Sequence, residues 1–295
     1  MFEKVPMSDR IEVVLHAKPR DLGGITVRRV LPAIQRRMIG PFIFVDHFGP
    51  LDIPPSKGFD VRPHPHICLA TVTFLWRGEI VHRDNLGSLQ PIHPGDVNWM
   101  VAGRGIVHSE RSGPEARANG QHVHGLQCWV ALPDRDEETA PHFEHHDAKS
   151  LPTIEREGVK MTVIAGDAWG ERSPVSVLSR TLYVDTYLAR GAELVLPDDH
   201  QERAVYVVDG DVEEGDDVWN SGTMLVFRGG VRASVRALSD AHVVLFGGDP
   251  LGERFIDWNF VASSKERIAR ARKEWKDQSF AKIPGDDQEF IPLPD

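Results

Sequence analysis

The sequence has no long hydrophobic run. None of its apolar stretches approaches the roughly 18 to 20 residues that a membrane-spanning helix needs. The N-terminal segment MFEKVPMSDRIEVVLHAKP also lacks the apolar core of a secretory signal. We therefore expect a protein that stays in the cytoplasm and has no part in a membrane.

The sequence also has few cysteines, and its acidic residues outnumber its basic ones. The two cysteines, Cys68 and Cys128, lie in apolar strand-like segments, which predicts reduced thiols rather than a disulfide framework. The formal net charge of −10 opposes binding to a phosphate backbone, because that binding depends on Lys and Arg displacing counterions. We therefore expect no direct nucleic-acid partner. The rest of the composition is that of an ordinary globular protein, and 295 residues suffice for two domains with buried cores.

Helical periodicity is rare before the C-terminus. Short β-branched or aromatic segments alternate with Gly, Pro and Asp, as in all-β barrels and sandwiches. Residues 263–278 are the exception: Ser263 begins a capping-box pattern, and Ile268, Ala271 and Trp275 fall on one helical face. This pattern predicts one amphipathic helix that covers a barrel. The expected strands are residues 12–16, 24–30, 42–48, 70–76, 96–100, 125–131, 161–165, 182–188, 204–208, 223–227 and 242–247.

A weak internal repeat indicates that one barrel is duplicated. The segment FLWRGEI (74–80) aligns with YVVDGDV (206–212), and in each half a second glycine, Gly95 or Gly222, precedes another apolar strand. The polar stretch around residues 133–158 suits a connection between the copies. The expected division is an N-terminal metal-binding barrel over residues 1–140, a linker over 141–158, and a C-terminal barrel without metal over 159–295, followed by the helix and tail.

The residues that can carry chemistry gather in the first half, in RPHPH (62–66) and VHSE (107–110). Residues i and i+2 of a strand share a face, so His64 and His66 can point at one place, as can His108 and Glu110. Three imidazoles and a carboxylate suit Fe, Mn, Co, Ni, Cu or Zn and leave positions open for water or substrate. We therefore predict one transition-metal ion held by these four side chains.

Several segments resemble the pirin family, and together they span the chain. They are DHFGP (46–50), RPHPH (62–66), GEIVHRDNLGS (78–88), GDVNWMVAGRGIVHSE (95–110) and WNFVASSKERI (258–268). The resemblance implies two tandem cupin barrels, with a metal, usually iron as Fe(II), in the first barrel. By the same resemblance the ligands are His64, His66, His108 and Glu110. It also implies a second barrel without metal.

One position departs from that pattern: Cys68 stands where such pirins often carry glycine. The first interpretation is a small buried side chain; the alternative is a thiol that faces the metal, in i, i+2 register with His66. Trp99, Met100 and Trp129 are expected in the core rather than as a substrate platform.

The other histidines are weaker candidates. For His82 we expect a loop or a hydrogen bond between strands. His122 and His124 have ligand-like spacing and are expected outside the metal site, with a place at the mouth of a pocket as the alternative. His145 and His146 are expected to be solvated in the linker.

Two functions agree with such a site. The first is a quercetinase-type dioxygenase that opens a flavonol with O2, in which Glu110 accepts the proton of the flavonol's 3-hydroxyl. The second is a metal-containing binding or redox-sensing protein of the pirin type that has a protein partner and no flavonol substrate. A metal-free scaffold is a third, weaker hypothesis.

Overall fold

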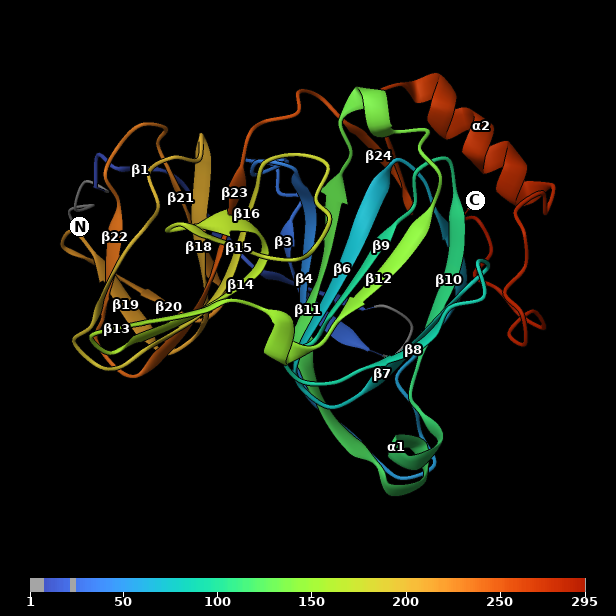
Figure 1. Ribbon diagram of the computed structural model, residues 1–295, viewed down its shortest axis with the longest axis horizontal. Helices are drawn as coiled ribbons and strands as arrows, with labels where there is room; N and C mark the ends of the chain where they lie inside the picture. The colour runs from blue at the N-terminus through green and yellow to red at the C-terminus, as the bar shows by residue number, and fades with distance from the viewer. Residues whose placement is uncertain (1–7, 22–24, 295) are drawn as a thin grey trace, which may run out of the picture. The chain divides into compact units, whose positions relative to one another are not determined.

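The computed structural model describes residues 8–21 and 25–294, and most of them form β-strands (Figure 1). Gly24, the first residue of one expected strand, lies outside these ranges, as do the first seven residues of the N-terminal segment. Every expected strand overlaps an observed one. None of the helices in the described part of the chain has the length and apolar character needed to cross a membrane.

The elements have the following bounds. The strands are β1 (Ile11–His16), β2 (Lys18–Asp21), β3 (Thr26–Leu31), β4 (Phe42–Ile53), β5 (Asp60–His66), β6 (Leu69–Arg77), β7 (Ile80–Asp84), β8 (Leu89–Ile92), β9 (Val97–Val101), β10 (Ile106–Arg111), β11 (Gln121–Ala131), β12 (His142–His146), β13 (Thr153–Arg156), β14 (Val159–Ala168), β15 (Glu171–Arg172), β16 (Thr181–Leu188), β17 (Glu193–Val195), β18 (Glu202–Asp209), β19 (Asp211–Glu214), β20 (Asp217–Asn220), β21 (Thr223–Phe227), β22 (Ser234–Ala237), β23 (Ala241–Gly248), β24 (Phe255–Asp257) and β25 (Phe260–Ala262). The α-helices are α1 (Pro114–Asn119) and α2 (Lys265–Lys276).

The chain forms two compact units, and each contains a large and a small antiparallel sheet. The first barrel comprises Pro19–Val27, Phe44–Ala148 and the chain from Leu251 onward. Its sheets have the strand orders β12-β9-β6-β11-β4-β3-β2 and β5-β10-β7-β8. Leu75 and Val123 of the large sheet pack in one core cluster with side chains of β7 and β8.

The second barrel comprises the chain up to Lys18, Arg28–Ile43 and Lys149–Pro250. Its large sheet runs β1-β21-β18-β23-β16-β14-β13, with β15 paired to β14, and its small sheet runs β17-β22-β19-β20. Val205 of β18 and Val235 of β22 belong to one apolar cluster, so this core also lies between two sheets. Two tandem cupin barrels with a C-terminal helix are therefore confirmed as the fold.

The units cross the domain boundaries expected from the sequence. Strand β1 pairs with β21, whose other edge is taken by β18, so the N-terminal strand completes the second barrel instead of the first. The expected linker also contributes a strand to the large sheet of each barrel: β12 pairs with β9 in the first, and β13 pairs with β14 in the second. Periodicity identifies a strand, but it does not say which exposed sheet edge the strand will join.

Helix α2 belongs to the first barrel. Ile268, Ala271 and Trp275 are buried in one cluster, as expected of a covering helix, and they pack against Val107 of β10. The N-cap lies one residue later than expected: the hydroxyl of Ser264 accepts the amide of Arg267 at 3.2 Å. Ser263 is not the cap, because its amide and hydroxyl both donate to the Glu137 carboxylate, at 2.7 and 2.8 Å.

The internal repeat corresponds to a matching turn in each barrel. Gly78, between β6 and β7, has φ +86°, and Gly210, between β18 and β19, has φ +78°. A Cβ atom at either position would lie 2.5 Å from a backbone carbonyl oxygen. Glycine is needed at both turns, because the conformation is left-handed and another chain segment approaches closely.

Candidate metal centre

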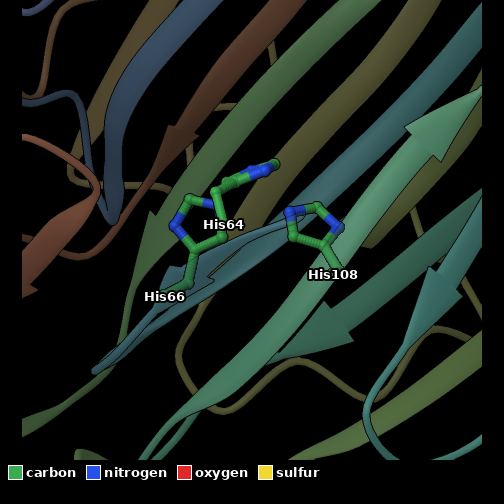
Figure 2. Close-up of side chains that lie close together, drawn as sticks. All are labelled: His64, His66 and His108. Carbon is green, nitrogen blue, oxygen red and sulfur yellow. The ribbon is translucent and has the colours of Figure 1, made fainter. Parts of the chain in front are cut away.

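Three histidine side chains converge inside the first barrel. His64 and His66 project from β5, and His108 projects from the neighbouring β10, where it is paired with His64 in register. One ring nitrogen of each lies within 4.8 Å of the others, and the three rings meet at one place in Figure 2. The predicted imidazole cluster is therefore present.

Strand β5 tolerates its two prolines because it is an edge strand. It is hydrogen-bonded to β10 on one side, in a sheet of order β5-β10-β7-β8. Proline cannot donate to a ladder, so Pro63 and Pro65 are compatible with an edge but not with the middle of a sheet. The prolines also restrict the backbone on both sides of His64, which reduces the entropy lost when the ligands assemble.

Burial keeps these imidazoles neutral. His64 is 6% exposed, and His66 and His108 are each 1% exposed. Desolvation lowers the pKa of His64 to about 4 and lowers the pKa of His66 and His108 well below the usual value. Neutral imidazoles have the lone pair that a metal ion requires.

The hydrogen bonds also fix which nitrogen carries that lone pair. His64 Nδ1 donates to the carbonyl of Arg62 at 2.8 Å, and His66 Nδ1 donates to the carbonyl of Asn259 at 2.9 Å. Both rings therefore have an unprotonated Nε2. His108 Nε2 is buried and has no hydrogen-bond partner among the described residues. An orphaned nitrogen at the meeting point of three neutral imidazoles fits a divalent transition metal.

Glu110 lies beside this cluster but does not belong to the set of mutually close ligand atoms. Its side chain is buried, and Oε1 accepts a 3.0 Å hydrogen bond from the hydroxyl of Thr73 on β6. Burial raises the pKa of Glu110, partly opposed by nearby His82 and by the Thr73 hydrogen bond. Its role as fourth ligand stays a prediction.

Aromatic residues of the large sheet border the cluster. Trp129 of β11 stacks on Phe44 with ring centroids 4.0 Å apart and contacts His66 edge-on at 5.0 Å. Trp129 is therefore both a core residue and a neighbour of the candidate ligand. Trp99 and Met100 are buried in β9, as expected of core residues.

Cys68 does not face the imidazoles. Strand β5 ends at His66, and Cys68 adopts φ +57°, so the alternation of faces stops before it. Its side chain packs in the α2 cluster with Ile67 and Phe260, and burial raises the pKa of its thiol to about 12. The small buried residue is therefore the correct interpretation, and its left-handed φ is a conformation that glycine adopts at lower cost.

The other histidines agree with their expected places to different degrees. His82 lies on β7 and is buried, not in a loop. Its Nδ1 lies 3.5 Å from Nδ1 of His108 on the neighbouring β10, which agrees with the expected hydrogen bond between strands. His122 is exposed and pairs with Asp52, while His124 Nε2 lies 2.8 Å from His47 Nε2, away from the three-imidazole set.

His145 and His146 lie on β12 and are only partly exposed. The expectation that they are solvated residues of a linker is therefore wrong. Among the residues that the structure describes, the second barrel holds one group of possible ligand atoms, Asp167, Asp199 and His200. There the guanidinium of Arg180 lies 2.5 Å from Asp199, so a protein cation already neutralises the group.

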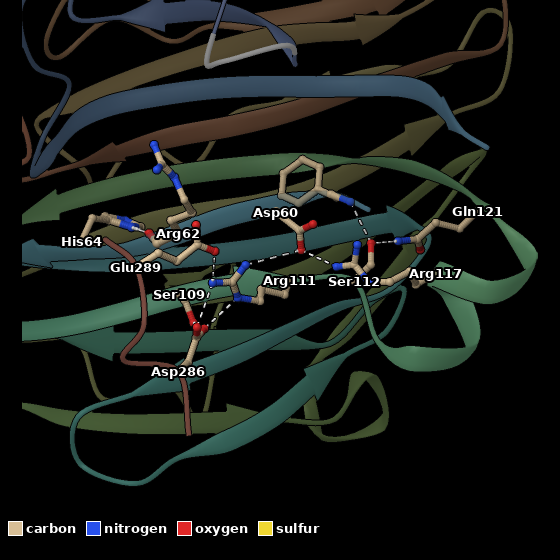
Figure 3. Close-up of polar contacts among 11 residues, drawn as sticks. Asp60, Arg62, His64, Ser109, Arg111, Ser112, Arg117, Gln121, Asp286 and Glu289 are labelled. Carbon is tan, nitrogen blue, oxygen red and sulfur yellow. Dashed lines mark hydrogen bonds and ion pairs between the residues drawn. The ribbon is translucent and has the colours of Figure 1, made fainter. Parts of the chain in front are cut away.

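The C-terminal tail supports the two ligand strands from outside. Asp286 accepts hydrogen bonds from Ser109 Oγ at 2.7 Å and from Arg111 Nε and Nη2 at 2.7 and 2.8 Å, as Figure 3 shows. The amide of Ile291 donates to the carbonyl of Pro63 at 2.8 Å. These contacts and the bond to the Asn259 carbonyl could not be inferred from spacing, because they join segments about 175 to 228 residues apart.

Sequence comparisons agree with this architecture. A family model described as "Pirin" matches residues 24–130, and one described as "Pirin C-terminal cupin domain" matches residues 183–281. A "Pirin-like protein" of Caulobacter vibrioides is 47% identical over 289 residues, which are 97% of this chain and 100% of the relative. "Pirin-1" of Arabidopsis thaliana is 32% identical over 276 residues, 90% and 92% of the two chains.

A solved structure is similar over nearly the whole chain. The crystal structure of quercetin 2,3-dioxygenase from Acinetobacter baumannii has a TM-score of 0.88 and 32% sequence identity, and the match covers 96% of this chain and 95% of that one. The two family models, the relatives and the duplicated barrel lead to the same assignment. The chain is a member of the pirin family.

Proposed function

We propose that the protein is a metal-dependent dioxygenase of the quercetinase type that opens a flavonol with O2, with Fe(II) as its metal, in the cytoplasm. The observation that carries this proposal is the orphaned Nε2 of His108 among three neutral imidazoles, next to a buried carboxylate. The quercetin dioxygenase fold neighbour supports the choice of substrate class. We also propose Glu110 as the fourth ligand.

When bound, the metal would act as a Lewis acid that lowers the pKa of the flavonol 3-hydroxyl. Glu110 would accept the hydroxyl proton. As a ligand that doubles as a base, Glu110 would release one carboxylate oxygen from the metal to take this proton, while the Thr73 hydroxyl orients the carboxylate through Oε1. Trp129, in edge contact with His66, provides an apolar wall suited to a planar aromatic substrate.

An oxygen electrode tests this proposal with quercetin and Fe(II)-loaded protein. We expect oxygen uptake by the wild type, loss of uptake together with metal in His66→Ala, and a drop of roughly 10²- to 10⁴-fold with retained metal in Glu110→Gln. No uptake by fully loaded wild type, or undiminished uptake in Glu110→Gln, would contradict the mechanism.

The second candidate is a metal-containing binding or redox-sensing protein with a protein partner. The net charge of −10 favours a protein over a nucleic acid as partner, and the relatives from Caulobacter and Arabidopsis are named pirins without an activity. This candidate gains support if loaded protein consumes no oxygen with any flavonol and binds a partner in only one oxidation state of the metal.

A further inference from the structure

Two buried polar residues of β7 lie beside His108. His82 is 4% exposed and Asp84 is fully buried. His82 Nε2 lies 2.9 Å from Asp84 Oδ2, and His82 Nδ1 lies 3.5 Å from His108 Nδ1. A carboxylate, an imidazole and a candidate metal ligand thus form one chain of contacts.

The direction of each hydrogen bond follows from Asp84. Its Oδ1 accepts the backbone amides of Leu86 and Ser88 at 2.9 and 3.0 Å, which orients the carboxylate. A carboxylate can only accept, so His82 must carry a proton on Nε2. With its proton on Nε2, His82 offers the lone pair of Nδ1, and the facing His108 Nδ1 then donates to it across 3.5 Å.

Packing holds this arrangement in place. The ring of Phe143 on β12 stacks on His82, with centroids 4.3 Å apart and an angle of 11° between the planes. In the ladder between β10 and β7, His108 pairs with Asp84 and Glu110 pairs with His82. The relay of Asp84, His82 and His108 therefore lies directly beside the strand that carries two of the predicted ligands.

We propose that His82 and Asp84 are positioning residues of the metal centre, which fix His108 in its Nδ1–H tautomer and so keep the Nε2 lone pair facing the ion. This inference rests on the metal site of the proposed function. Outer partners of this kind orient a ligating histidine, and their loss typically lowers metal affinity by about 10- to 100-fold.

Asp84→Asn is the sharpest test, because it exchanges one carboxylate oxygen for an amide nitrogen. The new side chain keeps an oxygen for the amides of Leu86 and Ser88 but presents its NH2 group to His82. His82 then protonates Nδ1, and His108 must move its proton to Nε2, the nitrogen that faces the ion. Asp96→Asn is the matched control: Asp96 is also buried and accepts two backbone amides, from His93 and Ala148, but its bonds within the described part of the chain involve none of the three imidazoles.

Two readouts separate the possible failures. ¹⁵N NMR of the metal-free protein reports the tautomer of His108, and chelator competition reports the Ni(II) dissociation constant. We expect Nδ1–H in wild type and Asp96→Asn, Nε2–H in Asp84→Asn, and a dissociation constant raised by about 10- to 100-fold in Asp84→Asn alone. The Nδ1–H tautomer and wild-type affinity in Asp84→Asn would overturn the inference. Failure of the wild type to bind Ni(II) would instead refute the metal site, while the tautomer still tests the relay.

A second pair of variants serves if Asp84→Asn does not fold. His82→Asn and His82→Leu both lose the bond to Asp84, but only the asparagine side chain keeps an acceptor for His108 Nδ1–H. We expect His82→Asn to retain the His108 tautomer and to bind Ni(II) more tightly than His82→Leu. Equal tautomers and equal affinities in the two variants would overturn the proposal.

Discussion

Replacing Asp286 by alanine removes the central acceptor between the C-terminal tail and β10. In the wild type, Ser109 and Arg111 donate three hydrogen bonds to its carboxylate, at 2.7 to 2.8 Å. The side chains of Asp286 and Arg111 are 12% and 18% exposed, so water screens this pair only weakly. The variant therefore loses a partly buried, bidentate ion pair.

The expected cost can be bounded. A hydrogen bond to a charged group contributes about 1.5 to 3 kcal/mol, and three bonds to one carboxylate are not additive. Arg111 also keeps its 3.0 Å contact with Glu289, which limits the penalty of an unpaired charge. We expect Asp286→Ala to weaken tail docking by about 2 to 3 kcal/mol at pH 7.

This loss should depend on pH. Burial acts to raise the pKa of Asp286, but the hydrogen bonds from Arg111 and Ser109 outweigh it and lower the pKa. A lowered pKa in the folded state means that the stabilisation is complete above the unfolded pKa of about 3.9 and disappears as the pH falls through the folded value. Wild type and variant should therefore differ at pH 7 and converge in strong acid.

Hydrogen exchange of the tail measures this directly, because the tail can open without global unfolding. We expect faster exchange of the Ile291 amide, which donates to Pro63, in Asp286→Ala. Asp277→Ala is the control: it removes an exposed pair with Lys273 from the same C-terminal segment and should leave that amide unchanged. Equal exchange of the Ile291 amide in wild type and Asp286→Ala at pH 7 would show that Asp286 does not hold the tail on β10.

Three further predictions concern stability and reactivity. Trp129→Ala should lower the free energy of unfolding by about 3 to 5 kcal/mol in urea titration, because it removes the ring that stacks on Phe44, and a loss below about 1 kcal/mol would contradict that packing. Gly78→Ala should cost at least about 1 to 2 kcal/mol in thermal unfolding, since φ is +86° and a Cβ would lie 2.5 Å from the carbonyl oxygen of His122; an unchanged melting temperature would count against it. Burial raises the pKa of the Cys68 thiol to about 12, so this thiol should resist iodoacetamide at about pH 8 in the folded protein and react after denaturation. Rapid labelling of the folded protein would show that the thiol is not buried.

The sequence predicted that His64, His66 and His108 converge, because strand geometry is local. His64 and His66 share a face through i, i+2 spacing alone, and one antiparallel pairing suffices to bring in His108. The alternative that placed the Cys68 thiol at the metal used the same rule and is wrong, since β5 ends at His66 and Cys68 has a positive φ. Local periodicity cannot reveal such a break where the residue is not glycine.

Partners contributed by distant segments were beyond prediction. Asn259 and Asp286 reach β5 and β10 only because the chain from β24 to the tail returns to the first barrel, and β1 reaches β21 by a similar long-range pairing. Thr73 did carry a signal: it is a polar side chain inside the apolar run LATVTFLW, and a buried polar residue requires a partner. Here the partners are Glu110 at 3.0 Å and Gln127 at 2.8 Å.

The most direct test of the metal centre is X-ray absorption at the metal edge, combined with metal analysis of protein loaded with one equivalent of Ni(II) or Fe(II). We expect one ion per chain with three imidazole nitrogens at about 2.0 to 2.2 Å, and loss of that ion in His108→Ala. An ion bound with fewer than three imidazoles, or bound equally well by His108→Ala, would contradict it.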